Sequence, residues 1–257
     1  DREREELLNI MHNAREDNRI DLYLQPIVTL PSRKVAFYEA FSRVRDETGQ
    51  IIFPRQYLNL AAETGLVGTL DNLLLFRCIQ VIRRLGPRRP NLRFFCNISP
   101  ASLNDEDFFP QFLDFMTNNL ELVDRLVFEF AQADVRNQSS EVEQSLASLG
   151  RRGFQFSMDQ VMDLDIDVAE LARRNFSYVK VGADTFLGDA PGHLHKEDLE
   201  ESLGRRNIDL IIEKIEDEAS VVEVLEYGVN LGQGYLFGEP RPSRDETATE
   251  DAETFEE

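Results

Sequence analysis

Polar side chains end most of the short apolar runs of this 257-residue chain. Carboxylates, amides, one amine and one guanidinium hold these positions: Gln25, Glu39, Arg43, Asn97, Glu129, Asp159, Lys180, Glu213 and Gln233. Carboxylate and amide oxygens are hard donors that suit Mg²⁺, Mn²⁺ or Ca²⁺. The candidate metal ligands are therefore Glu39, Asn97, Glu129 and Asp159. A guanidinium such as that of Arg43 can hold a phosphate through two parallel hydrogen bonds.

The cysteines and histidines do not have the spacing of a zinc site. Cys78 and Cys96 are far apart in apolar stretches, and His193 and His195 stand alone in a polar loop. We expect both thiols to be buried and unpaired, which favours a reducing compartment. We expect both histidines to lie at the surface.

Three alternating aspartates, Asp163, Asp165 and Asp167, invite comparison with a calcium-binding loop. The glycine and the terminal glutamate of that loop are absent. The run instead predicts a helix N-cap followed by an acidic first turn.

Short apolar runs alternate with amphipathic segments along most of the chain. Strands are expected over 23–28, 35–44, 92–99, 125–131, 154–159, 177–181, 208–213 and 229–232. Helices are expected from Pro54, from Asp71, and over 104–120, 140–150, 167–174, 196–204 and 217–227. About eight strands alternating with helices predict an α/β fold, a closed (β/α)8 barrel of the TIM type with a mostly parallel sheet. The active site of such a barrel lies at the carboxyl ends of its strands, where the polar residues above are expected.

Both ends of the chain differ from its centre, so the domain is expected to span residues 20–242. Residues 1–19 carry an apolar stripe among charges, which predicts a linker helix or the end of a coiled coil. Residues 243–257 are mostly acidic and polar, which predicts a disordered acidic tail. No apolar run reaches the roughly 18 residues of a membrane span. Because the chain starts at Asp1, we expect a piece of a longer cytoplasmic protein, with any membrane tether in the missing N-terminal part.

The composition excludes two broad classes of protein. The formal net charge is -20, from 28 Lys+Arg against 48 Asp+Glu, and offers few clusters for the basic face that binds a nucleic-acid polymer. With 42% hydrophobic residues, the chain is too apolar for disorder and can bury a full core. A small anionic ligand in a pocket is compatible with this charge if Arg43, Lys180 or a metal ion offsets the repulsion.

A set of short motifs follows in a fixed order along the chain. They are Gln25-Pro26-Ile27, Glu39-Ala40-Phe41 with Arg43, Ala62-Glu63-Thr64-Gly65-Leu66, Asn97-Ile98-Ser99, Glu129, Asp159, Lys180, Glu213-x-x-Glu216 and Gln233-Gly234-Tyr235-Leu236-Phe237-Gly238. From about Asp21 to Pro240 this set resembles the EAL domain, a family of cyclic-di-GMP phosphodiesterases and receptors. The family's barrel agrees with the predicted elements.

The resemblance implies a role for each matched residue. In active members, the counterparts of Glu39, Asn97, Glu129 and Asp159 hold a first metal ion, and that of Lys180 orients the attacking water. Contacts to the nucleotide are expected at Gln25, Pro26, Glu39, Phe41, Arg43, Asn97, Asp159, Lys180, Glu213, Gln233, Phe237 and Pro240.

Four departures from the family pattern fall on the second metal ion and its supporting loop. The family's Asp-Asp pair is Asp159-Gln160 here, and its Lys-x-Asp is Lys180-Val181-Gly182. Its Asp-Phe-Gly-Thr-Gly loop has no glycine over residues 160–164, and its second glutamate after the fourth strand is Gln132. Because affinity for hard cations follows ligand charge, the loss of two carboxylates predicts a weak second ion and failure of two-metal hydrolysis.

We therefore expect no working catalytic residue, with Lys180 and Glu213 as remnants, and a remnant first metal site. The expected function is that of a receptor that binds cyclic-di-GMP without hydrolysing it and without requiring Mg²⁺ or Mn²⁺. The degenerate pattern is similar to EAL domains of alphaproteobacterial flagellar-assembly and polarity regulators, which implies protein partners in signalling or flagellar assembly.

Two alternatives stay open at this stage. One is a slow metal-dependent cyclic-di-GMP phosphodiesterase in which Asp163 or Asp165 serves the second ion. The other is an interaction module without nucleotide binding, in which the altered loop closes the pocket.

Overall fold

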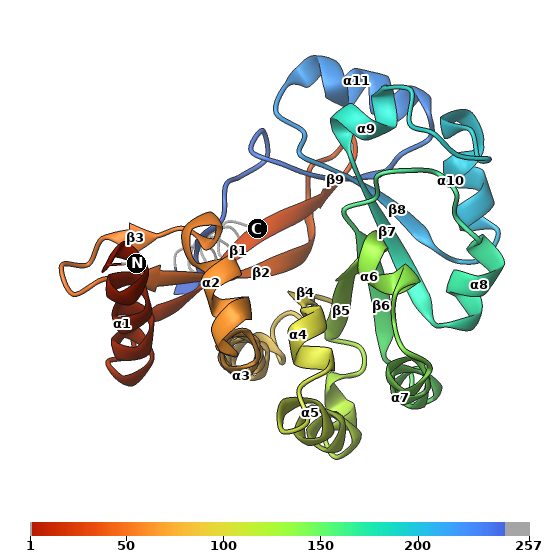
Figure 1. Cartoon of the computed structure of the whole chain (residues 1–257). Coiled ribbons are helices and arrows are strands. Elements are labelled where there is room, and N and C mark those ends of the chain that lie inside the picture. The colour runs from red at the N-terminus through yellow and green to blue at the C-terminus, as the bar shows by residue number, and fades with distance from the viewer. Residues whose placement is uncertain (1, 245–257) are drawn as a thin grey trace.

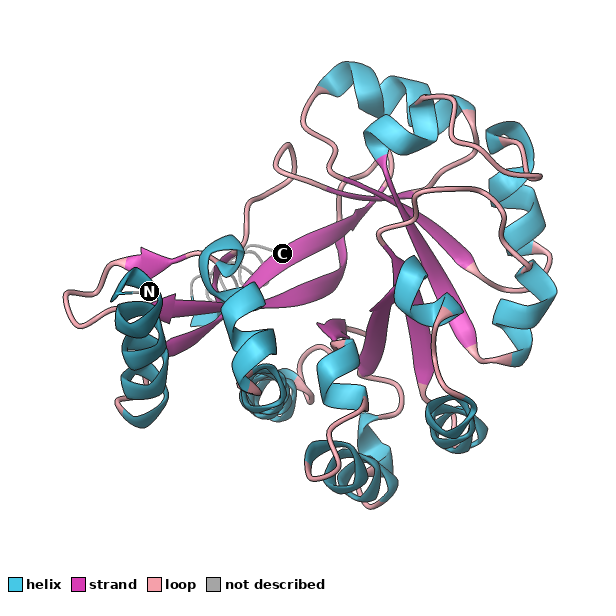
Figure 2. Cartoon of the chain, in the orientation of Figure 1, coloured by secondary structure: helices cyan, strands magenta, loops and turns pink. Residues whose placement is uncertain are grey.

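Eight strands close into a barrel with helices around its outside in the computed structural model, which describes residues 2–244 (Figures 1 and 2). Around the barrel the strands are β1 (Ile20–Thr29), β2 (Val35–Arg45), β4 (Arg93–Asn97), β5 (Leu126–Ala131), β6 (Gln155–Asp159), β7 (Phe176–Gly182), β8 (Asp209–Glu213) and β9 (Leu231–Gln233). The barrel is closed because β9 pairs with β1, which also pairs with β2. The predicted (β/α)8 barrel is confirmed.

The first strand runs against all the others in the barrel. β1 is antiparallel to both β2 and β9, whereas the pairs from β2 to β9 are parallel. The β1–β2 hairpin continues past the barrel, where short strands β3 (Ile51–Ile52) and β10 (Arg241–Pro242) pair with it. The expectation that Gln25 and Glu39 end their strands is therefore wrong, because both lie opposite each other in the middle of this long hairpin.

Helices cover the outside of the barrel and face it with their apolar sides. They are α2 (Pro54–Thr64), α3 (Val67–Leu85), α4 (Pro100–Leu103), α5 (Phe108–Thr117), α6 (Gln132–Arg136), α7 (Ser140–Arg151), α8 (Val168–Arg173), α9 (Ala183–Leu187), α10 (Lys196–Gly204) and α11 (Glu218–Glu226), with a 3-10 turn over Leu120–Leu122. In α7 the buried residues are Val142, Leu146 and Leu149, at the three- and four-residue spacing of one helix face. Ser139 begins this helix, and its hydroxyl accepts a hydrogen bond from the backbone N–H of Val142.

The helix predicted over 104–120 is shorter in the structure, because α5 covers only Phe108–Thr117 and a separate short helix, α4, ends before it at Leu103. Asn104 caps α4, and its side chain donates to the carbonyl of Pro100 at 2.9 Å. The Asp105 carboxylate then accepts from the backbone N–H groups of Asp107 and Phe108 (2.9 and 2.8 Å). Such local hydrogen bonds favour a turn over a continuous helix, so α5 begins only at Phe108. The helix predicted from Asp71 begins earlier, at Val67.

The barrel interior is apolar at one level and polar above it. Six buried residues form the apolar layer: Ile27, Phe95, Val127, Tyr178, Ile211 and Leu231. Phe95 contacts Tyr178 edge to face, with ring centroids 4.9 Å apart. The polar level lies directly on this layer, since the ammonium of Lys180 is 5.0 Å from the centroid of the Phe95 ring.

The N-terminal helix α1 (Arg2–Glu16) packs on the hairpin and on α2. Met11 and Ala14 are its buried residues, and they join a small core with Tyr57 of α2 and Val44 of β2. From residue 245 onward, the predicted acidic tail lies outside the described residues. No helix within residues 2–244 combines the length and the apolarity needed to cross a bilayer.

Candidate functional site

A buried ammonium lies between two carboxylates in the polar level of the barrel. Lys180 of β7 is fully buried, and its Nζ lies 3.1 Å from Glu39 Oε2 and 3.0 Å from Glu129 Oε1. These charges come from three strands that are brought together only by closure of the barrel. Although burial opposes the charge, the surrounding carboxylates raise the pKa of Lys180, so the amine is protonated.

Glu39 is held as a carboxylate by several donors. Asn97 Nδ2 donates to Glu39 Oε1 at 3.1 Å, and Gln233 Nε2 donates to Glu39 Oε2 at 2.6 Å. Burial alone would raise the pKa of Glu39, but Lys180 and these hydrogen bonds outweigh it and lower the pKa to about 2. Glu39 is therefore the charged partner of Lys180 throughout the neutral range.

Glu129 behaves in the opposite way. Burial and the charges of Glu39 and Asp159 raise its pKa well above the ordinary value, although Lys180 opposes this shift. Ser157 donates to its Oε2 at 2.6 Å. Two carboxylates that share one ammonium titrate as a coupled pair, and here Glu129 is the one whose pKa is raised.

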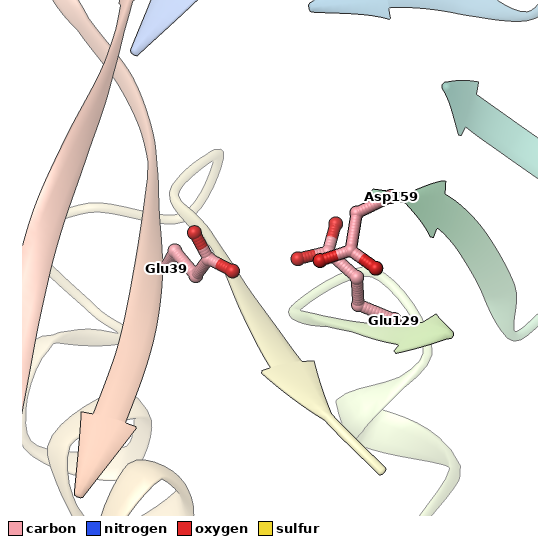
Figure 3. Close-up of side chains that lie close together, drawn as sticks. All are labelled: Glu39, Glu129 and Asp159. Atoms are coloured by element: carbon pink, nitrogen blue, oxygen red, sulfur yellow. The ribbon is translucent and has the colours of Figure 1, made fainter. Parts of the chain in front are cut away.

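Asp159 completes a group of three carboxylates that point toward one another from β2, β5 and β6 (Figure 3). One oxygen of each residue lies within 4.8 Å of the others. Asp159 Oδ1 is buried without a hydrogen-bond partner among the described residues. Burial, with the charges of Glu39 and Glu213, raises the pKa of Asp159 to about 7 against the opposing effect of Lys180.

This group fits one hard divalent cation. An unpartnered carboxylate oxygen beside two further carboxylates is an arrangement that Mg²⁺ or Mn²⁺ would satisfy. Asn97, the fourth candidate ligand, is adjacent because its side chain already contacts Glu39. Without a bound metal ion, the ammonium of Lys180 offsets the negative charge of the carboxylates.

Neither residue 160 nor residue 182 provides a carboxylate for a second ion. Gln160 follows Asp159 with a left-handed backbone, at φ 47°. Gly182 ends β7 opposite Glu213 of β8. A Cβ built on Gly182 would meet only Thr185 Oγ1, at 3.9 Å, so space does not require glycine at this position. Glu213 is half-buried, and burial raises its pKa.

The loop after β6 is held closely without glycine. Gln132 Oε1 accepts from the backbone N–H of Met162 at 2.9 Å, and Gln132 Nε2 donates to the carbonyl of Asp163 at 3.0 Å. Arg136 binds both carboxylate oxygens of Asp163 (2.8 and 2.6 Å). The three buried apolar side chains of the loop are Val161, Leu164 and Ile166.

The three alternating aspartates are engaged outside the carboxylate group. Asp163 pairs with Arg136, and Asp165 Oδ1 lies 3.1 Å from His193 Nδ1. The Asp167 carboxylate accepts from the backbone N–H of Glu170 at 3.0 Å, which confirms the predicted N-cap. These contacts do not favour Asp163 or Asp165 as ligands of a second ion.

The hairpin carries a row of side chains beside the carboxylates. In its register Gln25 lies opposite Glu39, Tyr23 opposite Phe41, and Asp21 opposite Arg43. Alternate residues of a strand share a face, so Glu39, Phe41 and Arg43 point to one side. The Arg43 guanidinium lies 5.4 Å from the Tyr23 ring centroid and 5.6 Å from that of Phe41. Sequence reasoning missed Tyr23, although its position two residues before Gln25 places it on the same face.

The segment after β9 adjoins the same hairpin. Gln25 Nε2 donates to the carbonyl of Gly238 at 3.1 Å, and Gln25 Oε1 accepts from Gln233 Nε2 at 2.9 Å. Gly234 has φ 156°, and a Cβ there would lie 2.1 Å from the carbonyl oxygen of Ile215, so only glycine fits this turn. Phe237 is half-buried, with the Arg33 guanidinium 5.4 Å from its ring centroid.

The structure therefore brings most of the predicted site residues together. Those linked by direct contacts are Gln25, Glu39, Asn97, Glu129, Lys180 and Gln233, with Asp159 beside them. The others border this group: Pro26 packs against Gly238, Phe41 and Arg43 continue along β2, Glu213 ends β8, and Phe237 and Pro240 follow β9. Cys78 and Cys96 are buried free thiols, and His193 and His195 are exposed, as predicted.

Comparison with known proteins gives one consistent family. The model of the EAL domain matches residues 8–240. The chain is 24% identical over 239 residues to the cyclic di-GMP phosphodiesterase PdeF of Escherichia coli, which covers 92% of the chain and 32% of PdeF. It is 26% identical over 242 residues to the probable cyclic di-GMP phosphodiesterase PdeI of Escherichia coli, covering 91% of the chain and 30% of PdeI. The chain thus spans about a third of the length of these relatives.

Solved structures share the fold. The PaMucR phosphodiesterase in complex with c-di-GMP aligns with a TM-score of 0.79 at 22% identity, covering 93% of this chain and 99% of that one. The FimX EAL domain of Pseudomonas aeruginosa bound to c-di-GMP aligns with a TM-score of 0.71 at 21% identity, covering 91% and 96%.

The buried ion cluster generates a first prediction. Lys180→Met should lower the free energy of unfolding by about 3–5 kcal/mol, because it leaves buried carboxylates without their cation. The double variant Lys180→Met/Glu39→Gln should lose less, since it also removes Glu39, the charged partner of Lys180. Urea unfolding in EDTA measures both. A double variant less stable than Lys180→Met would contradict the proposed coupling.

The raised pKa of Asp159 generates a second prediction. The folded protein holds this proton more tightly than the unfolded chain, so stability is lost as the pH rises from about 4 to about 7, by on the order of 2–4 kcal/mol. Asp159→Asn should remove the part of this stability loss that comes from titration of Asp159. Chemical unfolding in EDTA at pH 4.5 and 7.5 tests it, with the exposed Asp184→Asn as the control. Identical pH dependence in Asp159→Asn and the unmodified protein would refute the assignment.

Proposed function

Because the chain belongs to the EAL domain family, we propose that it is a receptor that binds cyclic-di-GMP without hydrolysing it. One observation carries this proposal. The hairpin and the β9 segment keep their polar and aromatic side chains in one continuous site, whereas residues 160 and 182 supply no carboxylate for a second metal ion.

Binding is supported by the side chains along β1 and β2. Cyclic-di-GMP carries two phosphate charges and two guanine bases. Arg43 lies against the rings of Tyr23 and Phe41, and its Nη1 donates to the carbonyl of Ser42 at 2.9 Å, which together limit the freedom of its guanidinium. The other donors of the guanidinium can contact a phosphate. The three side chains are half-buried, so their positions are accessible to a ligand.

Independence from metal is supported by the charge balance around Lys180. Its ammonium contacts Glu39 and Glu129, and burial raises the pKa of Glu129, which lowers the negative charge that this carboxyl contributes. The charged pair of Lys180 and Glu39 is then close to neutral overall. A dianionic ligand therefore meets no large unbalanced negative charge at the centre of the site.

Loss of hydrolysis is supported by the residues at the place where a second metal ion would bind. A pair of metal ions would supply a hydroxide and stabilise the in-line displacement at phosphorus. Glu39, Asn97, Glu129 and Asp159 would hold one such ion. For the second ion, Gln160 offers only a neutral amide, and Gly182 has no side chain. Asp163 is already bound by Arg136. Lys180 and Glu213 then persist as remnants of the catalytic arrangement.

A slow metal-dependent phosphodiesterase is the second candidate function. The unpartnered Oδ1 of Asp159 beside two further carboxylates favours it, because this group fits one divalent cation. An interaction module without nucleotide binding is less well supported, since Phe41 and Arg43 remain half-buried rather than covered by the altered loop.

We also propose that protein partners read the state of this receptor in flagellar assembly or cell polarity. The support is the pattern of lost second-ion ligands together with the charged helix that precedes the barrel. The protein would act in the cytoplasm, tethered to a membrane through a part of the protein that lies outside this sequence.

Binding by the hairpin gives a third prediction. Calorimetry with cyclic-di-GMP in EDTA should show binding to the unmodified protein, and Arg43→Ala should weaken it by about 1.5–3 kcal/mol, roughly 10- to 150-fold, the value of hydrogen bonds to a charged group. Arg152→Ala, an exposed substitution at the end of α7, is the control. Absence of heat at high micromolar ligand, or unchanged affinity in Arg43→Ala, would overturn the assigned site.

Restoring the missing carboxylates gives a fourth prediction. Gln160→Asp/Gly182→Asp should fold, because aspartate tolerates the left-handed backbone of residue 160 and a side chain at 182 has room. With Mg²⁺ or Mn²⁺, this variant should produce the linear dinucleotide, detected by chromatography, whereas the unmodified protein should not. Adding Glu129→Gln to the double variant is the negative control. Comparable turnover by the unmodified protein would instead establish the slow phosphodiesterase.

A further inference from the structure

Lys214 carries an exposed ammonium at the edge of the carboxylate site. It directly follows Glu213, the last residue of β8, and was not a predicted site residue. Its side chain is exposed and forms no hydrogen bond or ion pair with any residue in the part of the chain that the structure describes. The site therefore has a cation at its edge that the contacts within the site do not use.

The backbone next to Lys214 is fixed by hydrogen bonds to the β9 segment. The N–H of Ile215 donates to the carbonyl of Gln233 at 3.1 Å, and its carbonyl accepts from the N–H of Leu236 at 3.2 Å. The side chain of Ile215 is fully buried. Lys214 thus lies on an ordered turn between Glu213 and a residue that is bonded to Gln233.

Neither the backbone nor the packing explains why this residue is a lysine. Lys214 has a left-handed conformation, with φ 58°. Glycine or asparagine adopts this conformation more readily, whereas another side chain there costs on the order of 1 kcal/mol. Because the side chain is exposed, it also fills no space in the core. The remaining property of the residue is its charge.

This charge acts on the site. Burial raises the pKa of Glu213, and the ammonium groups of Lys180 and Lys214 oppose this rise. In the register of β7 and β8, Glu213 lies opposite Gly182, which supplies no carboxylate for a second metal ion. The ammonium of Lys214 therefore adjoins the edge of the site where a second cation would bind.

The acidic residues that follow Lys214 leave its ammonium available. The Asp217 carboxylate accepts from the backbone N–H of Ser220 at 2.7 Å, where it caps α11. Glu218 pairs with Arg33, whose Nη1 lies 3.0 Å from Glu218 Oε1. A lysine ammonium is a compact charge on a flexible side chain, so it can reach an anion that enters beside it.

We propose that Lys214 contacts a phosphate of cyclic-di-GMP and supplies positive charge at the edge of the site in place of a second metal ion. This inference rests on the proposed function, because it names a residue that holds the nucleotide. A cation at this edge attracts a dianionic ligand and repels a further cation. Lys214 thus favours metal-free binding of the nucleotide and opposes a metal ion beside Gly182.

Nucleotide affinity tests the phosphate contact. In calorimetry with cyclic-di-GMP in EDTA at low salt, Lys214→Gln should weaken binding by about 3- to 10-fold, the value of one hydrogen bond. Lys214→Arg should retain the affinity, and 1 M NaCl should reduce the difference, because the Debye length falls to about 3 Å. Lys34→Gln is the matched control, since Lys34 is exposed before β2, at the opposite end of the barrel.

Titration of Mn²⁺ into the nucleotide-free protein tests the position of the charge. Lys214→Gln should bind Mn²⁺ about 2- to 5-fold more tightly than the unmodified protein at low salt, because a nearby like charge is removed. Lys34→Gln should bind it as the unmodified protein does. An Mn²⁺ affinity that does not change in Lys214→Gln would overturn the placement of this ammonium beside the carboxylates.

The two measurements separate this inference from the proposed function. Absence of nucleotide binding by the unmodified protein would overturn the proposed function and the phosphate contact together. Nucleotide binding that is equally tight in Lys214→Gln would overturn the role of Lys214 alone.

Discussion

The buried ammonium of Lys180 is the interaction on which the polar half of the barrel depends. Three strands place carboxylates where water is excluded, and carboxylates in such a place repel each other strongly. Lys180 offsets this repulsion, with Asn97 and Gln233 adding hydrogen bonds to Glu39. The result is a division of roles, in which the pKa of Glu39 is lowered, the pKa of Glu129 is raised, and Asp159 has one oxygen unpartnered among the described residues.

This charge balance is compatible with the proposed binding of a nucleotide without a metal ion. The carboxylate group can exist without a metal ion because the protein carries its own cation. The loop after β6 is likewise held by Gln132, Arg136 and buried apolar side chains rather than by ligands of an ion. The hairpin that faces the proposed nucleotide site is anchored separately, through pairing with β9 and β10 and through packing of α1. The absence of carboxylates at residues 160 and 182 therefore need not disturb the surface that would recognise a nucleotide.

The antiparallel first strand explains the extent of this surface. A barrel made only of parallel strands would present short strand ends at one rim. Here β1 and β2 continue past the rim, so Gln25, Tyr23, Phe41 and Arg43 extend the site along one hairpin.

The sequence by itself determined the barrel, the family motifs and the residue types of the site, because strand and helix periodicities and ordered motifs are local patterns. It also indicated the missing carboxylates at 160 and 182. Only the tertiary structure decided the break at Asp105, the direction of β1 and the position of Glu39 within its strand, because turn hydrogen bonds and strand pairing override local propensity. It alone decided which carboxylate has a raised pKa and which has a lowered one. Burial and proximity between residues far apart in the chain set pKa values and surface charge, and no local pattern contains them.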